Sequence, residues 1–328
     1  MTTVHRICVA LVTCLASVAC SPAERPASSA PGTTETTPTA TGSGAAEPAS
    51  GSATADDNSA PNQVAPEQAA EGSSVANGRP LTEFAAGSER QNELFGLAAD
   101  ALRAGRQDAA ITALLTLGET TEPSEVRGRG MLLLAAIYLE QERHDQVLRV
   151  LNELRTTAPP MAQLEYMLGL SQEGMGDIPA ATTSLRNATR IDSSYLPPYI
   201  ELARVFQEHD RGSDAEEINL LFERQVARMG EELDSAAAPA QKQAVLERLA
   251  EVQPDERVSR AAARGVDDED NQVALYAIAA LVQIGTPSAI PTLQAVVENP
   301  RNAELAQLAT VAMEYIQERA SQTATATP

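Results

Sequence analysis

The sequence is poor in several residue types that folded domains and catalytic sites commonly use. It has no tryptophan, only 3% aromatic residues and a single lysine, Lys242. Its three cysteines, Cys8, Cys14 and Cys20, all lie in the N-terminal stretch that ends at Cys20. Because no thiol follows Cys20, the rest of the chain cannot form an intramolecular disulfide or a thiolate metal site.

Positive charge is also scarce, because 24 basic residues stand against 45 acidic ones, for a formal net charge of −21. Such a chain repels phosphate, so we expect no nucleic-acid binding and no electrostatic attachment to anionic lipid. The simplest interpretation of the acidic excess is a solvated surface, and a preference for basic partners is the alternative. Alanine makes up much of the 43% hydrophobic content, which favours helix over sheet.

The motifs of common enzyme classes are missing as well. There is no phosphate-binding loop, dinucleotide fingerprint, nucleophile elbow or zinc-protease helix. His144 and His209 are expected at turns between paired helices. The run Asp267 to Asp270 lacks the ligand spacing and turn glycine of a calcium loop, so we interpret it as charge at a helix start, with metal binding as the alternative. We expect no catalytic residue, no metal, no cofactor and no small-molecule substrate.

The segment 1–19 has the pattern of a secretory signal. Arg6 supplies the positive charge, and every residue from Ile7 to Ala19 is apolar or small. A stretch of that length is too short for a permanent membrane helix, which needs about 20 residues. No later segment carries a long enough apolar run, so we expect no membrane-spanning helix in the rest of the chain.

The segment Leu15-Ala-Ser-Val-Ala-Cys20 resembles the lipobox of bacterial lipoproteins. That resemblance implies cleavage after Ala19 and a diacylated Cys20 as the only attachment to the membrane. Ser17 departs from the pattern, since leucine is usual there. The alternative is an ordinary signal peptide with a free thiol left nearby. Because Ser21, and not aspartate, follows the cysteine, we expect an exported protein anchored in the outer membrane and facing the periplasm.

Residues 20–85 hold the lipidated cysteine and a segment rich in Ser, Thr, Ala, Pro and Gly. Val64 and Val75 are the only large aliphatic residues between 21 and 80. This composition cannot bury enough apolar surface to offset chain entropy, so we predict a disordered tether. A flexible chain of that length has a root-mean-square reach of roughly 45 Å. A glycan-bearing stalk is the alternative interpretation.

Helical periodicity begins at Glu89 and recurs in four windows. Each window has a small residue at the same place, and the interval between successive small residues is nearly constant. The four small residues are Ala98, Ala135, Gly169 and Ala203. The clearest window begins Tyr166-Met-Leu-Gly169 and continues through the turn Gly176-Asp177.

These windows resemble tetratricopeptide (TPR) repeats, which implies four helical hairpins over residues 89–230. In such a hairpin a small residue lets the second helix approach closely, and neighbouring hairpins stack because one alone cannot bury its apolar face. Val147, where alanine is usual, and Asn219, where a large residue is usual, depart from the pattern. We expect the fourth hairpin to be irregular or to act as a cap.

Residues 240–320 resemble short HEAT repeats of the phycobilin-lyase type, without implying lyase activity. A helix is expected from Gln272 to Ile284, and its small and apolar positions reappear in the same order between Ala306 and Ile316. Gly285 suits its C-terminus, while Thr286 and Pro287 are suited to start the next helix. A more degenerate pair is expected at about 241–265, and a disordered tail at 321–328.

The predicted fold class is therefore all-α: a solenoid of helical hairpins, TPR-like and then HEAT/armadillo-like, after a signal peptide and a disordered linker. In the TPR resemblance the first helices line a concave groove. One groove position is apolar or aromatic in all four hairpins, namely Phe95, Leu132, Tyr166 and Ile200. Polar flanking positions are Arg103, Arg129, Gln163, Arg204 and Gln207. The alternative is that some of these residues pack between hairpins.

The functional prediction is a membrane-anchored envelope scaffold, an adaptor or assembly factor, that binds a peptide or helix of another protein in this groove. The absence of cations at the apolar row argues against a clamp for a terminal carboxylate. The second hypothesis is a structural or regulatory spacer with contacts through the HEAT-like surface. An enzyme is the third and least favoured class, because no group of titratable residues supports one.

Overall fold

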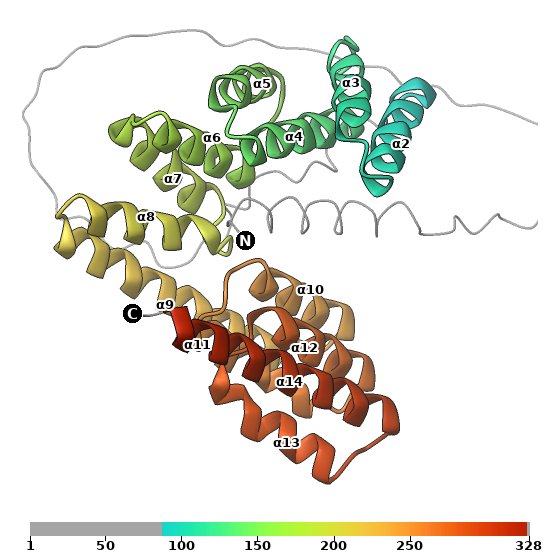
Figure 1. Ribbon diagram of the computed structural model, residues 1–328, viewed down its shortest axis with the longest axis vertical. Coiled ribbons are helices and arrows are strands. Elements are labelled where there is room, and N and C mark those ends of the chain that lie inside the picture. The colour runs from blue at the N-terminus through green and yellow to red at the C-terminus, as the bar shows by residue number, and fades with distance from the viewer. Residues whose placement is uncertain (1–86, 327–328) are drawn as a thin grey trace, which may run out of the picture. The chain divides into compact units, whose positions relative to one another are not determined.

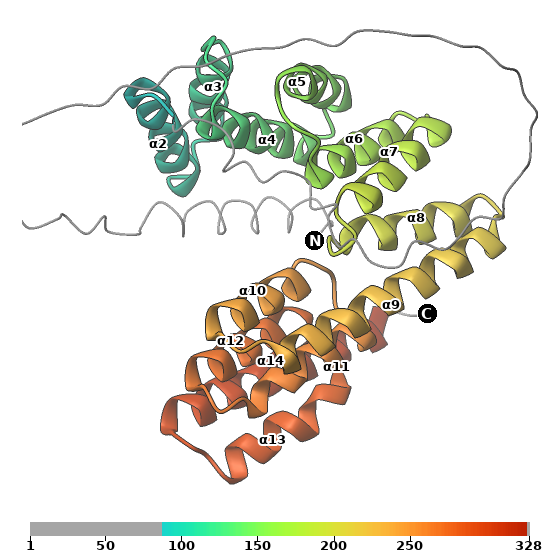
Figure 2. The ribbon, with the colours of Figure 1, turned by 180° about the vertical axis from the view of Figure 1, so that it is seen from behind.

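The computed structural model describes residues 87–326, and over this range the chain is helical and contains no strand. The predictions for 1–85, including Cys20, lie outside the described residues. Figures 1 and 2 show the helices from opposite sides. The N-terminal helices are α2 (Glu89–Arg103), α3 (Gln107–Gly118), α4 (Glu125–Glu140), α5 (His144–Thr157), α6 (Ala162–Gly174), α7 (Ile178–Ile191), α8 (Pro197–Glu208) and α9 (Gly212–Ser235). The C-terminal ones are α10 (Pro239–Ala250), α11 (Glu256–Ala263), η2 (Arg264–Asp267), α12 (Asn271–Ile284), η3 (Pro287–Ala289), α13 (Ile290–Glu298) and α14 (Ala303–Ala326).

Helices α2 to α9 pair as four consecutive hairpins. The pairs are α2–α3, α4–α5, α6–α7 and α8–α9, and the turns between partners are short and of equal length. Each hairpin packs on the next, through α3 on α4, α5 on α6 and α7 on α8. The predicted all-α fold of stacked helical hairpins is confirmed.

All four turns inside these hairpins use one residue with left-handed backbone. The residues are Gly105, Glu142, Gly176 and Asp210, with φ of 68°, 56°, 82° and 55°. Each follows the small residue of its hairpin at the same distance along the chain. The amide of the next residue then donates back to a carbonyl in the last turn of the first helix, as Arg143 does to Tyr138 and Arg211 to Phe206. This bond ends the first helix and reverses the chain.

The small residues of the repeat pattern lie where paired helices meet. Ala98 and Ala135 are fully buried, as are the facing residues Ala110 and Ala181 of the second helices. At Gly169 the approach is closer still, because a Cβ built there would lie 2.6 Å from Cγ of Leu185. The close approach expected from the sequence is thus present, and the large apolar residues around it form a continuous core.

Helix α9 belongs to both halves of the described chain. Its first part pairs with α8, and its later part packs against α10, α11 and η2, as both views show (Figures 1 and 2). One stripe of buried apolar residues runs along its whole length, from Ile218 through Phe222 and Val226 to Leu233. The fourth hairpin therefore does not end in a solvated cap, because its second helix continues as a shared core element.

The C-terminal helices form two further hairpins, α11–α12 and α13–α14, with α12 packed between α10 and α14. The helix expected at 272–284 is present as α12, and Asp270 caps its start by accepting from the amides of Gln272 and Val273. The prediction of charge at a helix start is thus confirmed for Asp270, whereas Asp267 ends η2 and Asp268 pairs with Lys242. The pair expected at 241–265 differs, because α10 packs on α9 and α12 whereas α11 pairs with α12.

Two features at the C-terminal end differ from the predictions, the first only in part. Thr286 is at the N-cap position and Pro287 is the first residue of a short 3-10 turn, as predicted. The side chain of Thr286, however, does not cap this turn but donates to Glu256 Oε2 at 2.8 Å. Helix α14 continues to Ala326, so residues 321–326 are helical where we predicted disorder. The composition of residues 321–326 does not indicate this extension. The residues continue a helix whose earlier part is held in place by packing, as the burial of Ile316 shows.

Candidate partner-binding surfaces

The four apolar positions predicted to line a groove differ in exposure. Leu132 and Tyr166 are 3% and 1% exposed and belong to the core, while Phe95 and Ile200 are half-buried at its edge. The continuous open row that the repeat pattern predicted is therefore closed at its two middle positions. For those two residues the structure matches the alternative, packing between hairpins.

Tyr166 shows how the closure arises. Its ring meets the ring of Tyr195 edge-on, with centroids 5.6 Å apart, so the connection between α7 and α8 covers it. Burial, with the nearby charge of Glu201, raises the pKa of Tyr166 well above its ordinary value. The phenol therefore stays neutral and serves as packing at physiological pH.

The polar residues predicted to flank the row are placed on the first helices but are largely committed to neighbours. Arg103 pairs with Asp100 and Arg129 with Glu125, each on its own helix. Gln163 is half-buried and Gln207 is exposed. Exposed pairs of this kind contribute little to stability, so Arg103 can exchange its partner for one on another protein.

Arg204 is the most heavily paired of the predicted residues. Its guanidinium contacts Glu173 at 2.6 Å, Glu201 at 2.8 Å and Glu208 at 2.9 Å, linking α6 to α8. Partial burial lowers its pKa, but hydrogen bonds to the three carboxylates outweigh this and raise the pKa above the ordinary value. Because three carboxylates surround one guanidinium, the cluster carries a net negative charge and does not offer Arg204 as a free cation.

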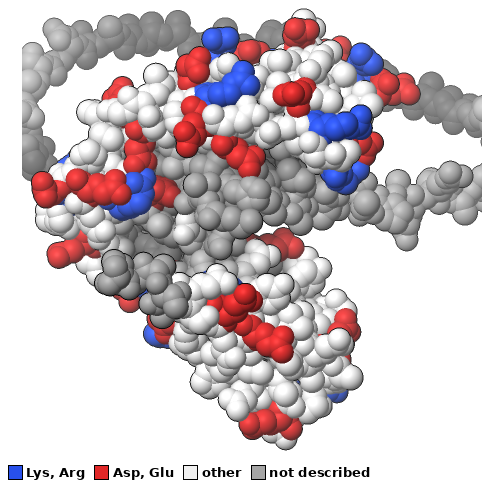
Figure 3. All heavy atoms as spheres, in the orientation of Figure 1, with Lys and Arg blue, Asp and Glu red and all other residues white. Residues whose placement is uncertain are grey.

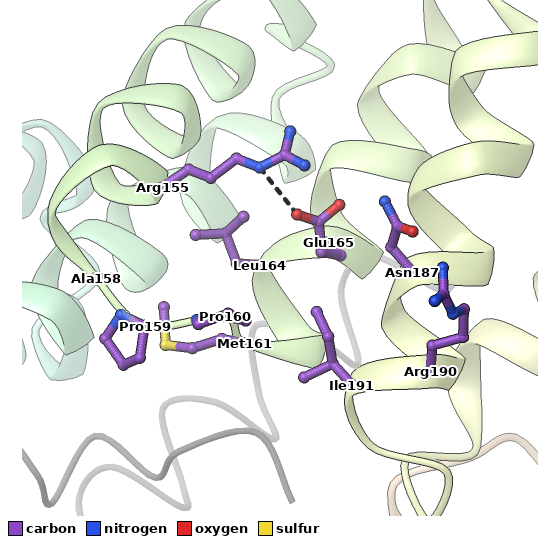
Figure 4. Close-up of a pocket in the computed structure, with 10 residues that line it drawn as sticks. All are labelled: Arg155, Ala158, Pro159, Pro160, Met161, Leu164, Glu165, Asn187, Arg190 and Ile191. Atoms are coloured by element: carbon purple, nitrogen blue, oxygen red, sulfur yellow. Dashed lines mark ion pairs between the residues drawn. The ribbon is translucent and has the colours of Figure 1, made fainter. Parts of the chain in front are cut away.

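The structure brings together a hollow that the sequence analysis did not identify. It is a cavity of about 460 Å³ between the end of α5, the α5–α6 connection, the start of α6 and the end of α7 (Figure 4). Pro159, Pro160 and Met161 form one wall, and Ile191 lies beside Met161 on the α7 side (Figure 4). The remaining lining is mainly polar and is supplied by Arg155, Glu165, Asn187 and Arg190.

Glu165 is the unusual residue of this hollow. Its side chain is only 6% exposed, and its Oε1 pairs with Nε of Arg155 at 3.1 Å. Its Oε2 is buried and has no hydrogen-bond partner within residues 87–326. Arg155, by contrast, is 53% exposed, so the pair joins a buried carboxylate to a cation at the surface.

A sequence signal for this site did exist in the repeat register. Glu165 lies one helical turn before Gly169, and the matching positions in the other hairpins are Leu94, Met131 and Tyr199. All three are large, and all are buried. A carboxylate at a position that is otherwise a buried large residue is a departure that side-by-side comparison of the four windows would have shown.

No cluster of three or more His, Cys, Asp or Glu side chains suited to a metal ion occurs within residues 87–326. Asp268, from the predicted acidic run, pairs with Lys242. His144 begins α5 with its ring against Gly174, and His209 follows the last residue of α8. Over the same part of the chain, no helix is long and apolar enough to cross a bilayer.

Surface charge over the described helices is mixed, with acidic side chains in excess on the face in Figure 3. The C-terminal helices carry few charged side chains on that face. Large apolar side chains are exposed at several places in the described chain, and three of them, Tyr276, Val311 and Tyr315, belong to the neighbouring helices α12 and α14.

Comparison with known proteins identifies no family. No family model matches the chain, and no curated protein matches it. Among solved structures, the chain is similar to one described as the crystal structure of MamA protein, at 13% sequence identity and a TM-score of 0.38. The match covers 65% of this chain and 97% of that one. A likeness this low carries no argument about function, which rests on the chain's own residues.

Proposed function

We propose that this protein is a non-enzymatic scaffold that binds other proteins, exported and held at a bacterial envelope membrane by a lipid on Cys20. The observation that carries the scaffold role is the stack of hairpins from α2 to α9. The hairpins have the same turn conformation and pack on one another through their inner faces. Their outer faces are left to contact other proteins. Extended surfaces of stacked helical hairpins are well suited to bind peptides and helices.

The anchor rests on the sequence alone. The segment from Leu15 to Cys20, the short apolar stretch before it and the lack of any later thiol all favour acylation of Cys20. Two or more acyl chains give firm membrane attachment, whereas one gives marginal binding. The long segment before Glu89 would then keep the helical part near the membrane without fixing its orientation.

The anchor is tested by growing cells with an alkyne-tagged palmitate and analysing the purified protein by mass spectrometry. The wild-type N-terminal peptide is expected to begin at Cys20 and to carry a diacylglyceryl group. Cys20→Ser is expected to lose the tag, while Cys14→Ser, altered only in the signal region, keeps it. A wild-type protein with an unmodified thiol at Cys20 would refute the anchor.

The scaffold role is tested by crosslinking in intact cells followed by purification from solubilised envelopes. Phe95→Ala with Ile200→Ala truncates the two accessible positions of the apolar row. Leu97→Ala with Leu220→Ala is the matched control, because both leucines are more than half exposed on α2 and α9. We expect a specific partner to be lost from the first variant and kept by the second, with thermal melts checking that both are folded. A wild-type protein that crosslinks to nothing above background would refute the scaffold role.

The second candidate is a spacer whose contacts are made by the C-terminal helices, and the exposed tyrosines of α12 and α14 favour it. Tyrosine is enriched where proteins meet, because its ring offers apolar area and its hydroxyl a hydrogen bond. Tyr276→Ser with Tyr315→Ser in the same crosslinking experiment separates the two candidates. Loss of the partner from this variant alone would assign binding to the C-terminal surface.

A further inference from the structure

The hollow beside Glu165 combines a break in the repeat pattern with an unmet hydrogen bond. The first, second and fourth hairpins have a large buried residue at this position. The third hairpin has the carboxylate of Glu165 there, and it is equally buried. A buried ion is costly even when it is paired, and a hydrophobic residue of similar size is often neutral or stabilising in its place. Stability therefore does not explain why a carboxylate occupies this position.

The atom that lacks a hydrogen-bond partner, Oε2 of Glu165, lies at the hollow. Oε1 of Glu165 forms an ion pair with Arg155, while Oε2 has no hydrogen-bond partner in the described chain. Figure 4 shows the second oxygen directed away from Arg155, toward the side of the hollow where Asn187 lies. A buried carboxylate oxygen without a donor is unfavourable, and an incoming N–H group relieves that penalty.

The cations of the hollow are available to an anion. Because Nε of Arg155 is bound to Glu165, the terminal nitrogens of that guanidinium remain at the more exposed end. Arg190 lies across the hollow on α7, is exposed, and forms no ion pair within residues 87–326. The lining of two guanidinium groups and one carboxylate is locally positive, in a chain whose net charge is −21.

We propose that this hollow binds an extended peptide segment with an acidic side chain next to an apolar one. The acidic side chain is bound between Arg155 and Arg190, and a main-chain N–H beside it donates to Oε2 of Glu165. The apolar neighbour lies on Met161 and Ile191. The proposal rests on the scaffold role proposed above, and it specifies the chemistry of a partner segment.

The size and the lining of the hollow suit an extended peptide segment. A cavity of about 460 Å³ falls within the range of roughly 300–1,000 Å³ that is typical of ligand sites. Pro159 and Pro160 lack amide donors and so present a rigid apolar wall. An extended peptide places an acidic and an apolar side chain on this wall while keeping its main-chain amides available.

The experiment uses the full chain in detergent and calorimetric titration with three capped pentapeptides that differ only at the centre. These are acetyl-Gly-Leu-Glu-Leu-Gly-amide and its Gln and Lys counterparts. The Glu peptide is expected to bind at least about tenfold more tightly than the Gln peptide, because charge-assisted hydrogen bonds to arginine are lost in the latter. Equal binding of the Glu and Gln peptides, no binding of any peptide, or preference for the Lys peptide would each overturn the proposal.

Matched variants locate the binding. Arg190→Gln is expected to abolish the preference for Glu over Gln. Arg224→Gln changes the exposed arginine at the equivalent position of the next hairpin, on α9, and is expected to leave that preference unchanged. Glu165→Leu restores the apolar type of the other hairpins, so it should melt no lower than wild type yet lose the peptide. Retained binding in Glu165→Leu would refute the role of the carboxylate.

Different results would refute the scaffold role and the peptide site beside Glu165. If the wild-type protein crosslinks to partners in cells but Arg190→Gln keeps the full set and no peptide binds, the scaffold role stands and this hollow is not the site. If the wild-type protein has no partner in cells, the scaffold role falls, whatever the peptides show.

Discussion

Gly169 of α6 lies against Leu185 of α7 with no room for a side chain. A Cβ at Gly169 would lie 2.6 Å from Cγ and 2.8 Å from Cδ2 of Leu185, and 3.3 Å from the carbonyl oxygen of Ala181. Leu185 is fully buried, so it has no free space into which to withdraw. The glycine therefore sets how closely the two helices of the third hairpin pack.

Gly169→Ala is accordingly expected to lower the free energy of unfolding by about 1–3 kcal/mol, the usual penalty for overpacking. Gly96→Ala is the matched control, because Gly96 is also inside a helix but a Cβ there would meet nothing within 4 Å. That control should gain up to about 1 kcal/mol from better helix propensity. Urea unfolding followed by circular dichroism measures both, and equal effects of the two substitutions would contradict the close packing.

The turns inside the hairpins give a second pair of variants. Gly176 has a φ of 82° and Glu142 has a φ of 56° at equivalent positions. Gly176→Ala should lower the free energy of unfolding by about 1 kcal/mol, because L-residues are strained in the left-handed region. Glu142→Gly should raise it by a fraction of that amount, since the relief of strain exceeds the entropy of glycine. Thermal melts that shift in the same direction for both variants would rule out this account.

Asp268 links stability to pH. Burial of the Asp268 carboxyl raises its pKa. Hydrogen bonds from Lys242 and the amide of Asp270, together with the charges of Lys242 and Arg301, lower the pKa by more than burial raises it, so the pKa of Asp268 is below the ordinary value. The carboxylate is therefore stabilising above the unfolded-state pKa of about 3.9, and this stabilisation is lost as pH falls through the lower folded-state pKa.

Asp268→Asn is expected to be less stable than wild type by about 1.5–3 kcal/mol at pH 7, the range for a hydrogen bond to a charged group. The difference should shrink as pH falls below about 4, because Asp268 of the unfolded chain is protonated first, and it should disappear only below the lower folded-state pKa. Urea unfolding at pH 7, 5, 4 and 3 measures the difference. A constant gap across this series would show that the charge of Asp268 is not the cause.

Arg127 of α4 donates hydrogen bonds to the C-terminal end of α3. Its Nε and Nη2 donate to the carbonyl of Gly118 at 3.1 and 2.9 Å, and Nη2 also pairs with Glu153 at 2.7 Å. The carbonyls of a last helical turn lack partners within the helix, and a cation there is favourable. Arg127→Ala should lower the free energy of unfolding by about 2–4 kcal/mol. Arg127→Lys should lose less than half of that, as it keeps the charge but not the fork of donors. Urea unfolding of both variants measures the losses, and equal losses would show that the charge contributes nothing.

Much of the helical fold could be predicted from the sequence because the repeat is local. The small residues at Ala98, Ala135, Gly169 and Ala203 mark where two helices touch, and the turn follows at the same distance in every hairpin. The residues that adopt the left-handed turn were predictable at Gly105 and Gly176. Glu142 and Asp210 adopt the same left-handed conformation without a glycine, which the residue type alone does not predict.

The candidate sites could be predicted only in part. The pattern placed Tyr166 and Leu132 on the correct helices, but it could not show that other elements cover them, as Tyr195 covers Tyr166. Arg204 was predicted as a polar position flanking the groove, but the sequence did not show that three carboxylates from two helices surround it. The hollow beside Glu165 is built by segments that periodicity treats independently.

Local pattern was enough to establish that the chain after Glu89 forms paired helices and where each pair closes, because helix periodicity and small contact residues act over a few turns of chain. Which side chains remain at the surface was settled by packing between distant segments. That packing joined α9 to both groups of hairpins, covered Tyr166, and left one oxygen of Glu165 without a donor from the described part of the chain. Exposure depends on what packs over a residue from elsewhere in the chain, and no local pattern records that.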